Sequence, residues 1–240
     1  FLTSYSKLVI AEKMGTEYNG YYAIASKFGV MLTLVSFAFT MAWQEMAFTK
    51  TGYNKATSNF YSKAATSYST LLINGTIILI PIISILFPLL VDPRYSEAKS
   101  IIPIYIMATI LSIMASFLGN ILTAYKKTNF IFISTLAASI VNLIVIYSTI
   151  KYLGVLSAPL GLFLGYLINC IFRIALIKKI IDFNLILSNK MFFIVALIIV
   201  LYSYFNFGFL INTLLSVLFL TIMILINKST INKLIVKLLN

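Results

Sequence analysis

Long apolar runs separated by short polar connections dominate the sequence. Seven of these runs approach the roughly 20 residues that a helix needs to cross a bilayer, and a shorter run, Phe1–Ala11, precedes them. The predicted membrane-spanning helices cover residues 21–43, 69–91, 101–124, 129–150, 154–177, 191–207 and 210–227. Asn206 and Gly208 interrupt the last long run, which favours two helices joined by a hairpin. The first run is too short to span, so residues 1–14 are predicted to be part of a helix that starts before Phe1.

The composition agrees with a membrane protein. Apolar residues make up 61% of the 240 residues and charged residues only 10%, which leaves too little polar surface for a soluble domain. The net charge of +12 comes from short basic clusters between apolar runs, not from a continuous patch, and nucleic-acid binding is therefore excluded. A single cysteine, Cys170, excludes an internal disulfide framework. The predicted fold class is all-α, a polytopic helical bundle.

Lys and Arg residues collect in alternate connections. Short loops rich in these residues stay on the cytoplasmic side of a membrane. One set of connections carries twelve of them: Lys50, Lys55, Lys63, Lys126, Lys127, Arg173, Lys178, Lys179, Lys190, Lys228, Lys233 and Lys237. The opposite set carries four: Lys13, Arg94, Lys99 and Lys151. This alternation supports the number of spans and predicts a cytoplasmic C-terminus, with the turn at residues 15–20 outside.

Two stripes suggest packing surfaces. Ala56, Phe60, Ala64 and Ser67 recur at helical spacing, which indicates either a short helix on the inner membrane face or an ordinary polar connector. A second stripe runs along the span at 154–177, where small residues would let another helix approach closely and the last member would emerge at the cytoplasmic end. Its members are Ser157, Gly161, Gly165, Asn169 and Arg173.

Lys27 lies inside an apolar span, and Lys7 has a similar position in the preceding helix. A lysine at the centre of a bilayer helix costs about 2.5 to 3.5 kcal/mol, so such a residue is a candidate for function. A hairpin turn over residues 15–20 would place both roughly 10 Å below the outer surface, where two cations could bind a diphosphate. The alternative is that each lysine extends its ammonium group to the headgroups.

Polar residues form a stripe along the span at 21–43. Its members are Ser26, Gly29, Thr33, Ser36, Thr40 and Gln44, the pattern of a helix that lines an aqueous path. At 100 degrees per residue, Lys27 lies on a different face of this helix. Either a bend near Gly29 brings the two faces together, or only one of them meets the cavity.

Further polar residues lie within or beside the spans. Asn120 and Asn142 must each bond to a neighbouring helix or face a water-filled cavity, and Asn142 is a candidate cavity residue. Glu45 follows a span and is expected at the membrane interface. The sequence contains no catalytic pair, phosphate-binding glycine loop or cluster of metal ligands, so neither an enzyme nor a cofactor or metal is predicted.

Several segments resemble one family of membrane proteins. Residues 20–27 (GYYAIASK) and 42–48 (AWQEMAF), followed by Ala124-Tyr125-Lys126-Lys127, Asn142, Lys151-Tyr152-Leu153-Gly154 and Gly161, are similar in order and spacing to segments of one group of flippases. These are the polysaccharide-biosynthesis (Wzx-type) lipid-linked oligosaccharide flippases of the multidrug/oligosaccharidyl-lipid/polysaccharide exporter superfamily. The chain departs from the family pattern in having Ser6-Lys7 in place of an acid-base pair and Glu45 in place of a proline. The first departure puts carboxylate-dependent ion coupling in doubt.

The resemblance implies a transporter of two six-helix lobes and two trailing helices. This chain would then supply the second lobe, residues 1–180, and the two trailing helices with a basic cytoplasmic tail, residues 181–240. Its partners would be a first lobe outside this chain, membrane lipid, other glycan-assembly membrane proteins and a polyprenyl-diphosphate-linked glycan. The implied function is flipping of an undecaprenyl-diphosphate-linked oligosaccharide to the outer leaflet of a bacterial plasma membrane, for surface polysaccharide synthesis. Lys27 and Lys7 would attract the diphosphate.

Three alternatives stay open. An exporter of cationic drugs, similar to the multidrug members of the superfamily, would be expected to have a buried carboxylate. A glycan polymerase would be expected to have a large outer loop with catalytic residues. A membrane scaffold without transport activity would tolerate neutralisation of both lysines.

Overall fold

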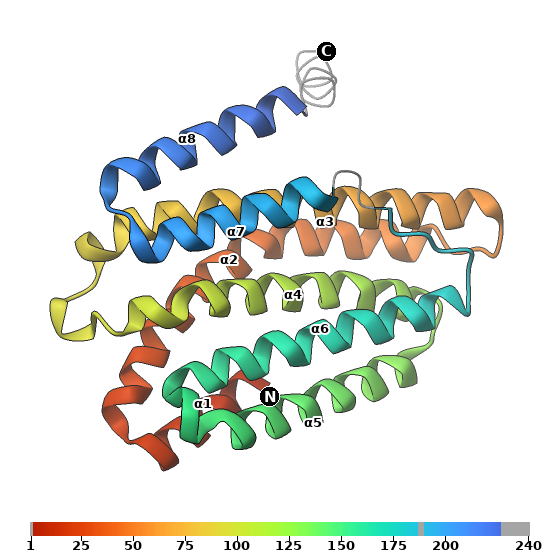
Figure 1. The fold of residues 1–240 in the computed structure, drawn as a ribbon. Helices are drawn as coiled ribbons and strands as arrows, with labels where there is room; N and C mark the ends of the chain where they lie inside the picture. The colour runs from red at the N-terminus through yellow and green to blue at the C-terminus, as the bar shows by residue number, and fades with distance from the viewer. Residues whose placement is uncertain (1, 187–189, 227–240) are drawn as a thin grey trace. The chain divides into compact units, whose positions relative to one another are not determined.

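The computed structural model describes residues 2–186 and 190–226, which form α-helices joined by short connections (Figure 1). The helices are α1 (Leu2–Met14), α2 (Thr16–Thr49), α3 (Lys55–Leu90), α4 (Ala98–Ala124), α5 (Thr128–Leu153), α6 (Ser157–Lys178), α7 (Lys190–Asn206) and α8 (Phe209–Ile226). Two short 3-10 helices, Pro93–Tyr95 and Gly154–Leu156, lie in connections. The all-α fold class predicted from the apolar runs is confirmed.

Each predicted span coincides with a helix. Four helical stretches of the described chain are long and apolar enough to cross a membrane: Thr16–Thr49, Lys55–Leu90, Ala98–Ala124 and Thr128–Lys178, the last of which combines α5 and α6. Helices α7 and α8 are shorter but also apolar. They are separate helices with a break at residues 207–208, as the sequence predicted. The chain is therefore built as a multi-pass membrane protein.

The short helix predicted on the inner membrane face is not a separate element. Residues 55–68 form the first turns of α3, which continues without a break to Leu90. The face of this segment that packs inward carries Tyr61, Ala65 and Tyr68, all of which are buried. Tyr61 donates a hydrogen bond of 2.8 Å to the carbonyl oxygen of Ala47 in α2. These inward contacts explain why the segment continues α3 and does not form a helix of its own.

The chain divides into two compact units. Unit 1 comprises residues 1–70 and 94–188, and unit 2 comprises residues 71–93 and 189–240. In unit 1, α4 packs between α2 and α6, and α6 packs against α5. Ile106, Leu118 and Leu122 of α4 are fully buried and form the centre of this core. The predicted division into a lobe over residues 1–180 and trailing helices over residues 181–240 stays a prediction.

A polar cluster around Asn212 of α8 holds the helices of unit 2 together. The side chain of Asn212 is 1% exposed and accepts a hydrogen bond of 3.0 Å from Ser203 of α7. Its amide donates to the hydroxyl of Ser84 in α3 at 3.5 Å and to the backbone carbonyl of Phe207 at 3.0 Å. Polar side chains hold helices together in this way where water is excluded.

Small residues bring α5 and α6 into close contact in unit 1. A β-carbon added at Gly161 would lie 2.6 Å from Oδ1 of Asn142, and one added at Gly165 would lie 2.8 Å from the carbonyl oxygen of Ala138. Both glycines therefore allow the backbones of the two helices to approach one another. The packing predicted for this part of the stripe is confirmed.

Gly165→Ala is expected to destabilise the protein by about 1 to 3 kcal/mol, because the new methyl group would press on backbone that cannot move aside. Thermal unfolding in detergent would measure the effect as a lower melting temperature. The matched control is Gly75→Ala in α3, where an added β-carbon meets no described atom within 4 Å. That change is expected to be neutral or to stabilise by up to about 1 kcal/mol, since alanine favours helix. Equal melting temperatures for the two variants would contradict the close packing of α5 on α6.

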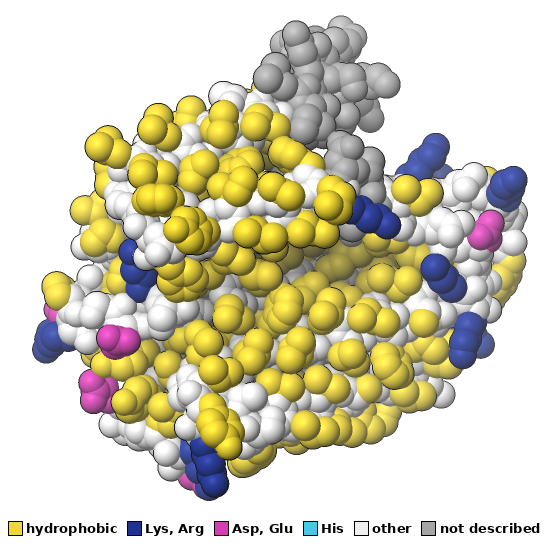
Figure 2. Space-filling view, in the orientation of Figure 1, with side chains coloured by type: hydrophobic (Ala, Val, Ile, Leu, Met, Phe, Trp, Pro, Cys, Tyr) yellow, Lys and Arg dark blue, Asp and Glu magenta, His cyan; other side chains and the backbone are white. Residues whose placement is uncertain are grey.

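Large apolar side chains cover much of the surface. Val35 of α2 is 79% exposed and Phe132 of α5 is 69% exposed, and many other exposed apolar residues accompany them. Figure 2 shows hydrophobic side chains spread over the visible face, with basic side chains gathered in a few places. Surfaces of this kind are stable in lipid but not in water. The basic tail predicted at Lys228, Lys233 and Lys237 lies outside the described residues.

Candidate functional site

Helices α1 and α2 meet at a single residue, Gly15. Its φ of +97° lies in the left-handed region, where a residue with a β-carbon is strained. The Tyr22 hydroxyl of α2 donates to the carbonyl oxygen of Thr3 at 3.4 Å. These two features hold the start of α2 against α1.

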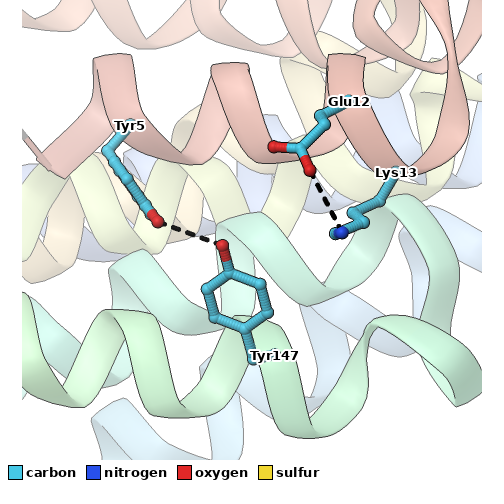
Figure 3. A network of polar contacts seen from close by, with 4 residues as sticks. All are labelled: Tyr5, Glu12, Lys13 and Tyr147. Atoms are coloured by element: carbon cyan, nitrogen blue, oxygen red, sulfur yellow. Dashed lines mark hydrogen bonds and ion pairs between the residues drawn. The ribbon is translucent and has the colours of Figure 1, made fainter.

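A contact between two tyrosines anchors α1 on α5. The hydroxyl groups of Tyr5 and Tyr147 are 3.1 Å apart, and Figure 3 shows the two side chains reaching toward one another. Glu12 and Lys13 form an exposed ion pair of 3.1 Å within α1 itself, which joins no second helix. Because α1 is held on both sides, the position of Lys7 is fixed by the fold of unit 1.

A cavity of about 390 Å³ lies among α1, α2, α4 and α6, all of which belong to unit 1. Polar and aromatic side chains form much of its wall. They include Lys7, Tyr22, Ser26, Thr33, Tyr105 and Tyr166. Hydroxyl groups from several helices therefore face a common space that is large enough for a small polar group.

Lys7 is the charged residue of this wall. No Asp or Glu of the described chain lines the cavity, and all six acidic residues of the sequence have exposed side chains elsewhere. A cation without a nearby carboxylate attracts anions. The cavity is therefore suited to an anionic group surrounded by hydroxyl and aromatic groups.

Gly29 determines how closely α2 approaches α4 at the cavity. A β-carbon at this position would lie 2.6 Å from Cε1 of Tyr105 and 2.7 Å from Oγ1 of Thr109. Both distances are too short for real contacts, so glycine allows the Tyr105 ring to lie against α2. Of the two alternatives left open by the sequence, the second holds, because the face of α2 that carries Gly29 lines the cavity and Lys27 does not.

The structure brings together three of the residues predicted from sequence, namely Lys7, Ser26 and Thr33. Ser26 donates to the carbonyl oxygen of Ala23 at 2.7 Å, and Thr33 donates to that of Gly29 at 2.8 Å. Their hydroxyl oxygens can still accept hydrogen bonds from a ligand.

The other predicted residues lie elsewhere. Lys27 is exposed on α2 beside Met31, which is 59% exposed, and it is not part of the cavity wall. Ser36, Thr40 and Gln44 continue along α2 beyond the cavity. Asn142 is buried between helices, where its amide donates to the hydroxyl of Ser6 at 3.2 Å.

The prediction that Lys7 and Lys27 lie at the same depth in the membrane depends on a turn over residues 15–20. Helix α2 starts at Thr16, so Lys7 lies about 12 Å along α1 from Gly15 whereas Lys27 lies about 18 Å along α2. The turn is therefore shorter than the glycine positions suggest, and the pairing of Lys7 and Lys27 at one depth stays a prediction.

Sequence reasoning missed the wall contributed by α4 and α6. Tyr105, Thr109, Ser112, Ser116 and Asn120 follow one another at steps of three or four residues along α4. This spacing is the signal of a polar helix face. It could have been found by the same search that identified the stripe on α2.

Arg173 does not extend into solvent at the end of its helix, as the sequence suggested. Its side chain is 6% exposed and lies inside unit 1.

Among the described residues, no group of three or more His, Cys, Asp and Glu side chains could hold a metal ion.

The long apolar helices and the polar cavity define a multi-pass helical membrane protein with a polar cavity between its helices. Among solved structures, the chain is similar to the lipid II flippase MurJ in its inward closed conformation, with a TM-score of 0.66 over 96% of this chain and 19% sequence identity. The similarity shows that this chain shares the helical membrane fold of the matching part of that protein. The chain spans about half of the MurJ chain, 51%. No family model and no curated protein matches the sequence.

Proposed function

We propose that this chain is the second lobe of a flippase, together with two trailing helices. The substrate is an undecaprenyl-diphosphate-linked oligosaccharide, which moves from the cytoplasmic to the outer leaflet of a bacterial plasma membrane for surface polysaccharide synthesis. In this orientation the C-terminus is cytoplasmic. The other lobe, which completes the path, belongs to the same protein.

The observation that carries this proposal is the cavity at Lys7. An ammonium group faces a space lined by hydroxyl groups and by the rings of Tyr22, Tyr105 and Tyr166. Lysine binds phosphate groups as a point charge, and hydroxyl and aromatic groups suit the polar edges and apolar faces of sugars. The similarity to MurJ, a lipid II flippase, supports a lipid-linked substrate.

An exporter of cationic drugs is less well supported. Such a transporter would need an acidic group in its path, but Glu12, Glu17, Glu45, Asp92, Glu97 and Asp182 are all exposed. A membrane scaffold remains the alternative from another class. It is distinguished from a flippase by whether the purified protein moves lipid-linked glycan by itself.

The complete transporter, reconstituted in liposomes, is expected to flip a fluorescent polyprenyl-diphosphate glycan faster than the matching polyprenyl-monophosphate glycan. The physical reason is that a diphosphate carries more charge and more acceptor oxygens to bind the cation. Quenching of the fluorophore in the outer leaflet would measure both rates. Equal rates for the two lipids would contradict recognition of the diphosphate. Failure to flip either lipid, with the protein folded, would favour a scaffold.

A further inference from the structure

Arg173 of α6 is buried among neutral partners. Its Nε donates to the hydroxyl of Ser134 at 3.1 Å, and a terminal nitrogen donates to the hydroxyl of Thr135 at 3.1 Å. The other terminal nitrogen donates to the backbone carbonyl of Ala115 in α4. The guanidinium group therefore joins α4, α5 and α6, while its positive charge has no carboxylate partner among the described residues.

A buried charge without a counter-charge is costly. Removing an ion from water costs several kcal/mol even after relaxation, and neutral hydrogen bonds offset only part of that cost. The three bonds of Arg173 use three of the five N–H groups that a guanidinium carries. The two remaining donors are available to an anion.

The guanidinium group lies at a second cavity of about 390 Å³ in unit 1. Asn120, Thr123, Thr135 and Asn169 are among the polar residues of its wall. The side-chain amide nitrogen of Asn120 and the side-chain carbonyl oxygen of Asn169 are buried without a hydrogen-bond partner among the described residues. Buried polar atoms normally have partners, so these two atoms point to a ligand or ordered water.

Gly119 makes room for the arginine. A β-carbon at this position would lie 2.7 Å from a terminal nitrogen of Arg173. Any larger residue would push the guanidinium group away from α4. The backbone of α4 is therefore shaped to accept this cation beside the unpartnered amide of Asn120.

The two cavities adjoin. Ser112 and Tyr166 belong to the walls of both. The polar face of α4 runs from Tyr105 in the first cavity to Thr123 in the second, a distance of about 27 Å along the helix. That length is close to the roughly 30 Å thickness of a bilayer core.

We infer that the Arg173 cavity is a second binding site for a diphosphate, on the cytoplasmic side of the Lys7 cavity. Arginine offers a planar fork of donors to phosphate oxygens, and Asn120 adds another donor. The site rests on the proposed function for its natural ligand, the diphosphate of the lipid-linked glycan. The lipid is first held at Arg173 and then passes along the polar face of α4 to Lys7.

Binding of radiolabelled pyrophosphate and of a polyprenyl diphosphate to the purified complete transporter tests this inference. Arg173→Gln is expected to weaken binding of the lipid diphosphate by about tenfold or more, since a charge-assisted interaction is lost. Arg173→Lys is expected to restore part of it. Asn120→Ala removes a donor but none of the three bonds of Arg173, and it is expected to weaken binding several-fold without lowering the melting temperature.

The outcomes separate the possible explanations. Lipid-diphosphate binding that is unchanged in folded Arg173→Gln and Asn120→Ala variants would overturn the second site and leave the proposed function intact. Loss of stability in both variants without loss of affinity would assign Arg173 to helix packing alone and would also overturn it. Binding of free pyrophosphate but not of the lipid would contradict a role in flipping. Intact binding in a protein that flips no lipid would contradict the proposed function but not the site.

Discussion

Lys7→Gln is expected to reduce flipping of a polyprenyl-diphosphate glycan by about tenfold or more. The substitution keeps a polar side chain, one atom shorter, but removes the cation from the wall of the first cavity. A hydrogen bond to a charged group contributes about 1.5 to 3 kcal/mol, and each 1.4 kcal/mol is a factor of ten. The rate of flipping in liposomes, at matched protein content, measures the effect.

Lys27 provides the matched control for this experiment. It is a lysine within the next helix, but its side chain is exposed outside the cavity. Lys27→Gln is therefore expected to retain most of the activity, and Lys7→Arg to retain part of it. A transporter that loses activity with Lys27→Gln but not with Lys7→Gln would show that the substrate follows the exposed face of α2.

Trp43→Ala is expected to lower the free energy of unfolding by about 3 to 5 kcal/mol, the range for removing a large aromatic side chain from a core. Trp43 is 1% exposed, and its ring stacks on Phe117 with centroids 4.2 Å apart. Its indole nitrogen also donates to the carbonyl oxygen of Phe117 at 3.3 Å. The side chain therefore fixes α2 against α4 with both its surface and its hydrogen bond.

Cys170 offers a way to measure this loss of stability. It is the single cysteine of the chain and is buried, so a thiol-reactive dye would label it only as unit 1 opens. Labelling of Trp43→Ala is expected at a lower temperature than labelling of the unaltered protein. Trp43→Phe keeps an aromatic ring and should lose less than half as much stability. Identical labelling curves for all three proteins would contradict a structural role for Trp43.

The helices could be predicted from the sequence because each of them repeats a simple pattern of residues. A run of about 20 apolar residues is enough to indicate a span, and the glycine stripe at Gly161 and Gly165 is enough to indicate close packing. The polar stripe on α2 also followed from spacing, and Ser26 and Thr33 of this stripe line the cavity together with Lys7.

The sequence could not show which of the two lysines, Lys7 or Lys27, lines the cavity. It depends on which face of α2 turns toward α4, and that rotation is fixed by the clearance at Gly29 against Tyr105. The depth of Arg173 was missed for a similar reason. A long side chain near a helix end can reach water or fold inward, and here partners on two other helices, among them Ser134, hold it inside.

The one-residue junction between α1 and α2 has a mechanical consequence. Gly15 alone lies between the two helices, so there is no longer linker that could adjust to a tilt of α1. In the proposed transport cycle, a tilt of α1 would require rotation about the backbone bonds of Gly15, and the ammonium group of Lys7, about two turns away, would move with α1. The reach of the cation is thus controlled by two torsion angles.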